Sequence, residues 1–169
     1  MTEQREDSEP PAMPRGRPPP DGMAEPALAL APARLSPRRL VVWRFYKQLW
    51  DRADTALIPQ LFHPGFTFRG SLGPVLVGHA AFADYVRWVT DCLADYTSDI
   101  LALAEDGDLV AAKLRFHGRH RRELFGIPPS GRHVWWHGAP FFRFEGDRVQ
   151  DLWVLGDLQG LMARLRGED

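Results

Sequence analysis

The chain has 169 residues, of which 44% are hydrophobic and 11% aromatic, so it can fill the core of one ordinary domain but not of two. Its 21 basic and 22 acidic side chains nearly cancel, so no global field draws it toward nucleic acid or an anionic membrane, and we expect neither as a partner. No apolar run approaches the roughly 20 residues of a membrane span, and the single cysteine, Cys92, cannot form an internal disulfide, so we expect a soluble cytoplasmic protein in which Cys92 is a buried apolar side chain.

Proline is concentrated near the N-terminus. Nine of the fifteen prolines lie between Pro10 and Pro37, in a stretch without aromatic residues. Such a stretch cannot bury enough apolar surface to offset the entropy that is lost on ordering. We therefore predict a disordered tail over residues 1–35 and one folded domain over residues 36–166. A docking peptide for a partner, around Arg15 and the prolines that follow it, is the alternative for the tail.

Three helices are predicted in the first half of the folded region. Ser36 can cap the first helix, and Pro37 fits its first turn, where a missing N–H costs nothing. The apolar residues of this helix, which recur at three- and four-residue spacing, are Leu40, Val41, Trp43, Phe45, Tyr46, Leu49 and Trp50. A short second helix is expected over residues 57–62 and a third over residues 82–93, with a brief strand at 66–68 between them.

The pattern changes to strands in the second half. Four segments have strand character, namely residues 96–104, 109–120, 132–144 and 148–155. They form two hairpins, because Gly107 and Gly146 lie in the connections and tolerate the positive φ angles of tight turns. A short helix is expected over residues 158–165. An antiparallel sheet must bury one face, and the helices are available to cover it, which predicts a two-layer α+β domain.

Asp157 is the strongest candidate for an acid or a base. Regular alternation along the last strand places on one face the residues Val149, Asp151, Trp153, Leu155 and Asp157. If the helices cover that face, Asp157 lies in a pocket beside Trp153, where partial desolvation raises its pKa toward neutrality. Its position directly before Leu158 also suits a helix cap, and this alternative stays open.

His120 is the second candidate, because an imidazole can hold or relay a proton at neutral pH. It shares a strand face with Phe116 and could act as a partner of Asp157, while a hydrated surface histidine is the alternative. The six histidines show no metal-ligand spacing with an acidic partner. The sequence also has no phosphate-binding loop and no nucleophile motif. We therefore predict neither a metal nor a cofactor.

Two segments of this half resemble the SnoaL-like polyketide cyclases, which share the fold of nuclear transport factor 2. The first, from Gly118 to Gly131, reads GRHRRELFGIPPSG and is similar to the family pattern GTHTGEFxGIPPTG. The second, from Arg143 to Trp153, reads RFEGDRVQDLW and is similar to RFxDGKIxExW, with Asp157 further along. The resemblance implies a cone-shaped α+β barrel, in which a strongly curved antiparallel or mixed sheet wraps over the three N-terminal helices and encloses a deep apolar pocket.

The resemblance also implies an activity. Such an enzyme closes a ring by an intramolecular aldol step on a polyketide-like or other secondary-metabolite intermediate, without a cofactor. Asp157 would remove a proton next to a carbonyl group, and His120 would hydrogen-bond to substrate oxygens. Arg69 stands where the family has a substrate-orienting residue. The residues expected to contact a hydrophobic small-molecule substrate are Tyr46, Trp50, Phe68, Arg69, His137, Arg143 and Trp153.

Two alternatives to this activity remain. The same fold supports the opening of an epoxide by a cyclase or hydrolase, and it also serves as a non-catalytic module for small-molecule binding or dimerisation. The fold further implies a homodimer through the outer face of the sheet. Regular alternation assigns Leu152 and Val154 to that face.

Overall fold

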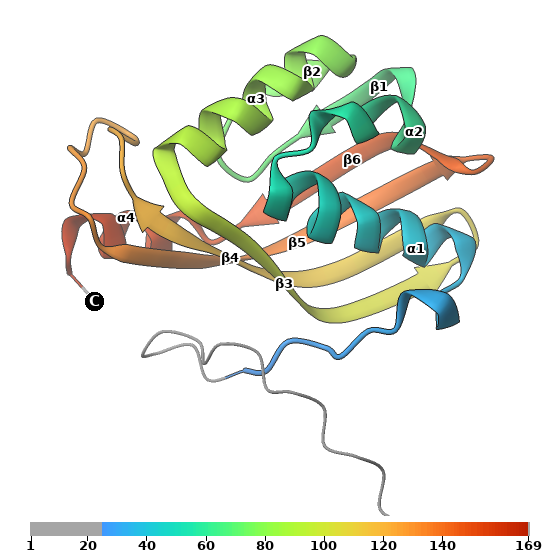
Figure 1. The fold of residues 1–169 in the computed structure, drawn as a ribbon, viewed down its shortest axis with the longest axis horizontal. Helices are drawn as coiled ribbons and strands as arrows, with labels where there is room; N and C mark the ends of the chain where they lie inside the picture. The colour runs from blue at the N-terminus through green and yellow to red at the C-terminus, as the bar shows by residue number, and fades with distance from the viewer. Residues whose placement is uncertain (1–24, 169) are drawn as a thin grey trace, which may run out of the picture.

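Six strands form one strongly curved sheet, and three helices cover one of its faces (Figure 1). The computed structural model describes residues 25–168. The strands are β1 Phe62–Arg69, β2 Val75–Val77, β3 Leu93–Asp106, β4 Leu109–His120, β5 His133–Glu145 and β6 Arg148–Gly156. Their order in the sheet is β2-β1-β6-β5-β4-β3, and every neighbouring pair is antiparallel except β1 and β6, which run parallel. The predicted cone-shaped α+β barrel with a mixed sheet is confirmed.

The first helix carries several inward-facing aromatic side chains. The Ser36 hydroxyl accepts a hydrogen bond from the Arg39 N–H (3.3 Å) and so caps α1, which spans Pro37–Arg44. The helix continues as a π-helical turn over Phe45–Trp50. A π-helical turn holds more residues than an α-helical one, so two pairs of residues that are adjacent in sequence can face the sheet. The buried residues of this turn are Phe45, Tyr46, Leu49 and Trp50.

Three further helices complete the layer structure. A single 3₁₀ turn at Thr55–Leu57 leads into α2, Ile58–Leu61, and α3 spans His79–Cys92. The last helix, α4, spans Leu158–Arg166 and packs against β5 away from α1, α2 and α3 (Figure 1). Cys92 is buried at the end of α3, as predicted. Among the described residues, no helix combines the length and the apolar character that crossing a membrane requires.

Strand β6 has one extra residue within the stretch that pairs with β5. Phe144 of β5 pairs with Val149, but Arg143 pairs with Asp151, so Gln150 has no partner on β5. This is a β-bulge, which shifts the alternation of side chains for the rest of the strand.

The bulge reverses the faces that regular alternation predicts. Leu152 and Val154 are buried beneath the helices, whereas Trp153 and Leu155 are exposed on the outer face. The prediction that Trp153 and Asp157 face the helices is therefore wrong. The prediction that Leu152 and Val154 form the outer face is wrong for the same reason.

Residues 25–35 belong to the folded structure, which corrects the predicted boundary at residue 36. The Leu28 N–H donates to the Ile100 carbonyl of the edge strand β3 (2.8 Å), and Arg115 donates to the Glu25 carbonyl (2.7 Å). An edge strand has unpaired backbone groups, and this segment satisfies one of them. The rest of the predicted tail, with the docking peptide considered for it, lies outside the described residues.

Candidate functional site

A cavity lies between the helices and the face of the sheet that they cover. It contains about 330 Å³ of space, counting the part that is open to solvent. The helices contribute Phe45, Tyr46, Trp50, Tyr85 and Val89 to its lining. The sheet contributes Phe68, Tyr96, Phe116, Trp136 and Val154, and the loop after β1 contributes Gly70, Ser71 and Leu72. The cavity is therefore walled largely by aromatic rings.

Two glycines make room for these rings. A Cβ atom on Gly70 would lie 2.7 Å from the ring of Phe68 and 2.8 Å from the hydroxyl of Tyr85. A Cβ atom on Gly138 would lie 2.4 Å from the ring of Phe116. Both separations are shorter than van der Waals contact, so a side chain at either glycine would push a ring out of the cavity wall.

The polar groups in the cavity are hydroxyl and indole groups. The Trp136 indole N–H donates to the Ser71 hydroxyl (3.2 Å), which ties the loop after β1 to the sheet. The three phenols of the chain, Tyr46, Tyr85 and Tyr96, all lie in the lining. Burial raises the pKa of each, so all three stay protonated and can donate hydrogen bonds. Neither a carboxylate nor an imidazole occurs among the described residues that line this cavity.

Three of the predicted substrate-binding residues lie in the cavity wall, namely Tyr46, Trp50 and Phe68. The other four do not, namely Arg69, His137, Arg143 and Trp153. Strand alternation explains their positions, because each is adjacent in sequence to a buried residue that faces the helices.

The four excluded residues have contacts or neighbours on the outer face. Arg69 donates to the Val154 carbonyl (2.8 Å), and its guanidinium lies 5.4 Å from the centre of the Trp153 ring. Arg143 forms an ion pair with Asp108 (3.6 Å). The ring of His137 lies 5.2 Å from that of Trp135. None of these groups is directed at the cavity.

Asp157 and His120 do not meet at the cavity. Asp157 is exposed, and its carboxylate accepts a hydrogen bond from the Gly160 N–H (2.9 Å), so the helix-cap alternative is confirmed and the predicted placement in the pocket is wrong. His120 is fully buried but does not line the cavity. Its Nδ1 lies 3.1 Å from the Ser130 hydroxyl, and its Nε2 has no hydrogen-bond partner. Burial lowers the pKa of His120, which favours the neutral imidazole.

Several lining residues were not among the predicted substrate-binding residues. Tyr85 and Val89 stand four residues apart on α3, which is the spacing of one helix face. Phe116 and Trp136 are direct partners across β4 and β5. Helical spacing and strand alternation could have indicated these two pairs, but the contribution of the loop after β1 follows only from tertiary packing.

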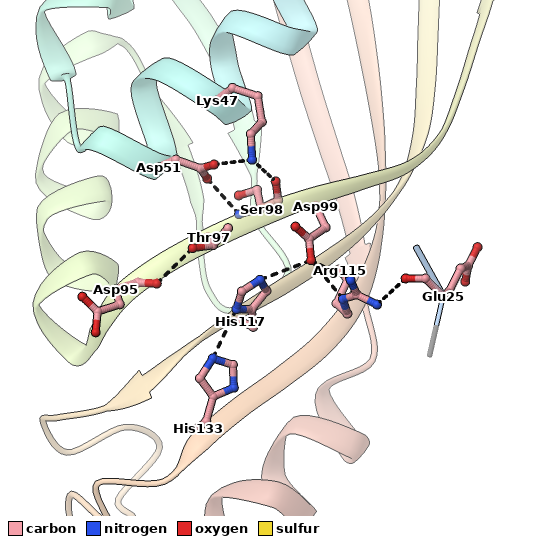
Figure 2. A network of polar contacts seen from close by, with 10 residues as sticks. All are labelled: Glu25, Lys47, Asp51, Asp95, Thr97, Ser98, Asp99, Arg115, His117 and His133. Atoms are coloured by element: carbon pink, nitrogen blue, oxygen red, sulfur yellow. Dashed lines mark hydrogen bonds and ion pairs between the residues drawn. The ribbon is translucent and has the colours of Figure 1, made fainter. Parts of the chain in front are cut away.

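A polar cluster lies on the other side of the sheet (Figure 2). Arg115 is only 3% exposed and donates to one Asp99 carboxylate oxygen through two nitrogen atoms, at 2.7 and 3.1 Å. His117 Nε2 lies 3.2 Å from the same oxygen, and His117 Nδ1 lies 3.2 Å from His133 Nε2. Burial alone would raise the pKa of Asp99, but hydrogen bonds and positive charge from His117 and Arg115 lower it to about 2. The cluster joins β3, β4 and β5 to the segment that contains Glu25.

The first helix is attached to β3 by a second group of contacts in Figure 2. The Asp51 carboxylate accepts a hydrogen bond from the Ser98 N–H (2.8 Å) and forms an ion pair with Lys47, which also donates to the Ser98 carbonyl (2.9 Å). These contacts fix the helix end that carries Trp50 over the cavity. Within residues 25–168, no group of three His, Cys, Asp or Glu side chains is arranged to hold a metal ion.

The chain is similar in sequence and in fold to known proteins. The profile of a family described as SnoaL-like polyketide cyclase matches residues 40–165. The chain is 27% identical over 116 residues to nogalonic acid methyl ester cyclase from Streptomyces nogalater, over 68% of this chain and 84% of that protein. It is 28% identical over 105 residues to aklanonic acid methyl ester cyclase from Streptomyces peucetius, over 60% of this chain and 66% of that protein. The structure of TsrD from Streptomyces laurentii is similar with a TM-score of 0.69 at 22% identity, over 80% of this chain and 100% of that chain.

Proposed function

Because the chain belongs to the SnoaL-like polyketide cyclase family, we propose that it binds a hydrophobic, oxygen-bearing small molecule of the polyketide type and promotes ring closure or isomerisation without a cofactor. The observation that carries the proposal is the aromatic cavity, whose rings come from both the helices and the sheet. Rings on opposite walls offer stacking and edge contacts to a flat ligand. Two cyclase relatives are named for acid methyl esters, which supports this class of ligand.

In this proposal, most of the rate enhancement comes from positioning the substrate in the cavity. A pocket that holds a flexible chain in a folded pose brings the reacting carbon atoms together, and well-oriented intramolecular reactions reach effective molarities of about 10⁵–10⁸ M. The phenol groups contribute hydrogen bonds to carbonyl oxygens, on which negative charge develops during the reaction. Asp157 has no part in this scheme, because its carboxylate caps α4 outside the cavity. Because the described lining has no carboxylate and no imidazole, the proton next to the carbonyl group passes to a base that enters with solvent from the open side.

Ligand binding without catalysis is the second candidate function. One observation favours it, since the described lining of the cavity has no carboxylate and no imidazole. The same observation disfavours epoxide opening, which needs a carboxylate to activate water or a hydroxyl group. A binding protein of this kind would release its ligand unchanged, whereas a cyclase would release a product with a new ring.

The substitution Val154→Phe tests the cavity as the ligand site. Val154 lines the cavity from β6, so a phenylalanine ring there should occupy the space of the ligand. We expect the affinity for aklanonic acid methyl ester, measured by quenching of tryptophan fluorescence, to fall about tenfold or more. Leu155→Phe is the matched control, because the adjacent side chain is exposed on the other face and its replacement should leave the affinity unchanged.

The same titrations separate the two candidate functions. Chromatography of the wild-type mixture shows whether the ester is converted, and binding without conversion would favour the second candidate. Equal affinities for wild type and Val154→Phe would contradict the assignment of this cavity. Failure of the wild-type protein to bind the ester would contradict the proposed ligand class.

We further propose a homodimer formed through an outer patch of the sheet, defined by Phe141, Trp153 and Leu155. These side chains are 40%, 40% and 54% exposed, and the rings of Phe141 and Trp153 lie 5.9 Å apart. Adjacent exposed apolar side chains are typical of interaction surfaces, and a two-fold contact would cover the patch on both copies. We expect Trp153→Glu to yield a monomer in light scattering, while Trp88→Glu on α3 keeps the dimer. A monomeric wild-type protein would rule out this contact.

A further inference from the structure

Tyr46 carries a polar atom that the folded protein does not use. The residue is 2% exposed and lines the cavity, yet its hydroxyl group has no hydrogen-bond partner. The Tyr46 ring lies 4.8, 6.2 and 5.9 Å, between ring centroids, from the rings of Phe45, Phe116 and Phe142, which offer no strong acceptor. Buried hydroxyl groups are nearly always paired, because an unpaired one loses its hydrogen bond to water without compensation. A ligand in the cavity would supply the missing partner.

The other two phenols of the chain line the same cavity as Tyr46. Burial is the main cause that raises the pKa of Tyr96. In Tyr85, the Leu72 backbone partly offsets the rise in pKa that burial causes. Within the described structure, Tyr46 is the phenol of this group whose hydroxyl is buried and unpaired.

We propose that the Tyr46 hydroxyl donates a hydrogen bond to a carbonyl or enolate oxygen of the bound ligand and thereby positions that oxygen in the cavity. The inference rests on the proposed function, since it assigns a role within the same cavity. Burial raises the pKa of Tyr46 well above its usual value, so the group is a donor throughout the neutral range. A donor among aromatic rings favours ligands that place a ketone oxygen at this point over hydrocarbons of equal shape.

The test compares two probes that differ by one carbonyl group, 9-fluorenone and fluorene. In the full-length wild-type protein we expect both probes to quench tryptophan fluorescence. We also expect the infrared frequency of the carbonyl stretch of bound ¹³C-labelled fluorenone to lie below its frequency in an apolar solvent. In Tyr46→Phe the stretch should return to that value. The dissociation constant of fluorenone should rise about tenfold relative to that of fluorene, as expected for the loss of one buried hydrogen bond.

Two controls separate this role from a structural one. Because Tyr46→Phe removes a group without a partner, its Tm should be unchanged or higher, and it should still bind fluorene. Tyr85→Phe removes a phenol of the same cavity to which the proposal assigns no contact with the carbonyl, so the lowered stretch should persist in that variant. A lowered stretch that survives Tyr46→Phe, or that is lost in Tyr85→Phe alone, would overturn the inference while leaving the cavity as the ligand site. If neither probe binds the wild-type protein, the inference and the proposed ligand class both fail.

Discussion

Replacing Phe45 with alanine is expected to lower the free energy of unfolding by about 4 kcal/mol. The residue is buried at the point where the π-helical turn meets the sheet. Its ring lies within 6.3 Å, between ring centroids, of five other aromatic rings, those of Tyr46, Trp50, Phe62, Phe82 and Phe142. Alanine would leave a void that these rigid rings cannot refill, so the lost burial and the lost dispersion contacts add.

Leucine at position 45 is the graded control for this prediction. Phe45→Leu keeps most of the apolar volume and should cost about 1–2 kcal/mol. Both losses of stability can be measured by urea denaturation at neutral pH. The comparison holds if the slope of the free energy of unfolding against urea concentration is the same in each variant. If the alanine variant were no less stable than the leucine variant, Phe45 could not have the central position in the core that the ring contacts indicate.

The substitution Arg115→Met should lower the free energy of unfolding by about 3 kcal/mol. It leaves the Asp99 carboxylate without the two hydrogen bonds that Arg115 donates, and removes the donor to the Glu25 carbonyl. Hydrogen exchange of the Leu28 amide should also become faster, because this amide lies in the segment that Arg115 holds against β3. Arg119→Met is the matched control on the same strand, since Arg119 is exposed and its replacement should change stability by less than about 0.5 kcal/mol.

The pH dependence of the stability of Arg115→Met tests whether Asp99 is the partner of Arg115. The pKa of Asp99 is about 2 in the folded protein, below its ordinary value of 3.8, so the stabilisation is present above about pH 4 and is lost as the pH falls through 2. The stability difference between wild type and Arg115→Met should therefore shrink, by on the order of 1 kcal/mol, as the pH is lowered from 5 to 2. A difference that stays constant over this range would exclude the carboxylate as the group that Arg115 stabilises.

The order of the longer elements follows from the sequence, because it depends on interactions between residues that are near one another along the chain. Ser36 caps the first helix as predicted. Gly107 and Gly146 adopt φ angles of +58° and +64° in the two predicted hairpin turns. The aromatic residues predicted for the pocket from the first helix and first strand lie in the cavity wall, namely Tyr46, Trp50 and Phe68.

Three features depend on tertiary contacts and were not evident from local patterns. The bulge at Gln150 arises from the pairing of β5 with β6, and one unpaired residue there is enough to turn Asp157 away from the cavity and Val154 toward it. Residues 25–35 join the folded domain because the Leu28 N–H donates to the distant edge strand β3 and Arg115 donates to the Glu25 carbonyl. The unpaired hydroxyl of Tyr46 depends on tertiary packing, because rings from β4 and β5 pack against this residue. Sequence periodicity determines which residues are apolar enough to be buried, but strand register determines which of them face the cavity, because a shift of one residue moves a side chain to the opposite face of the sheet.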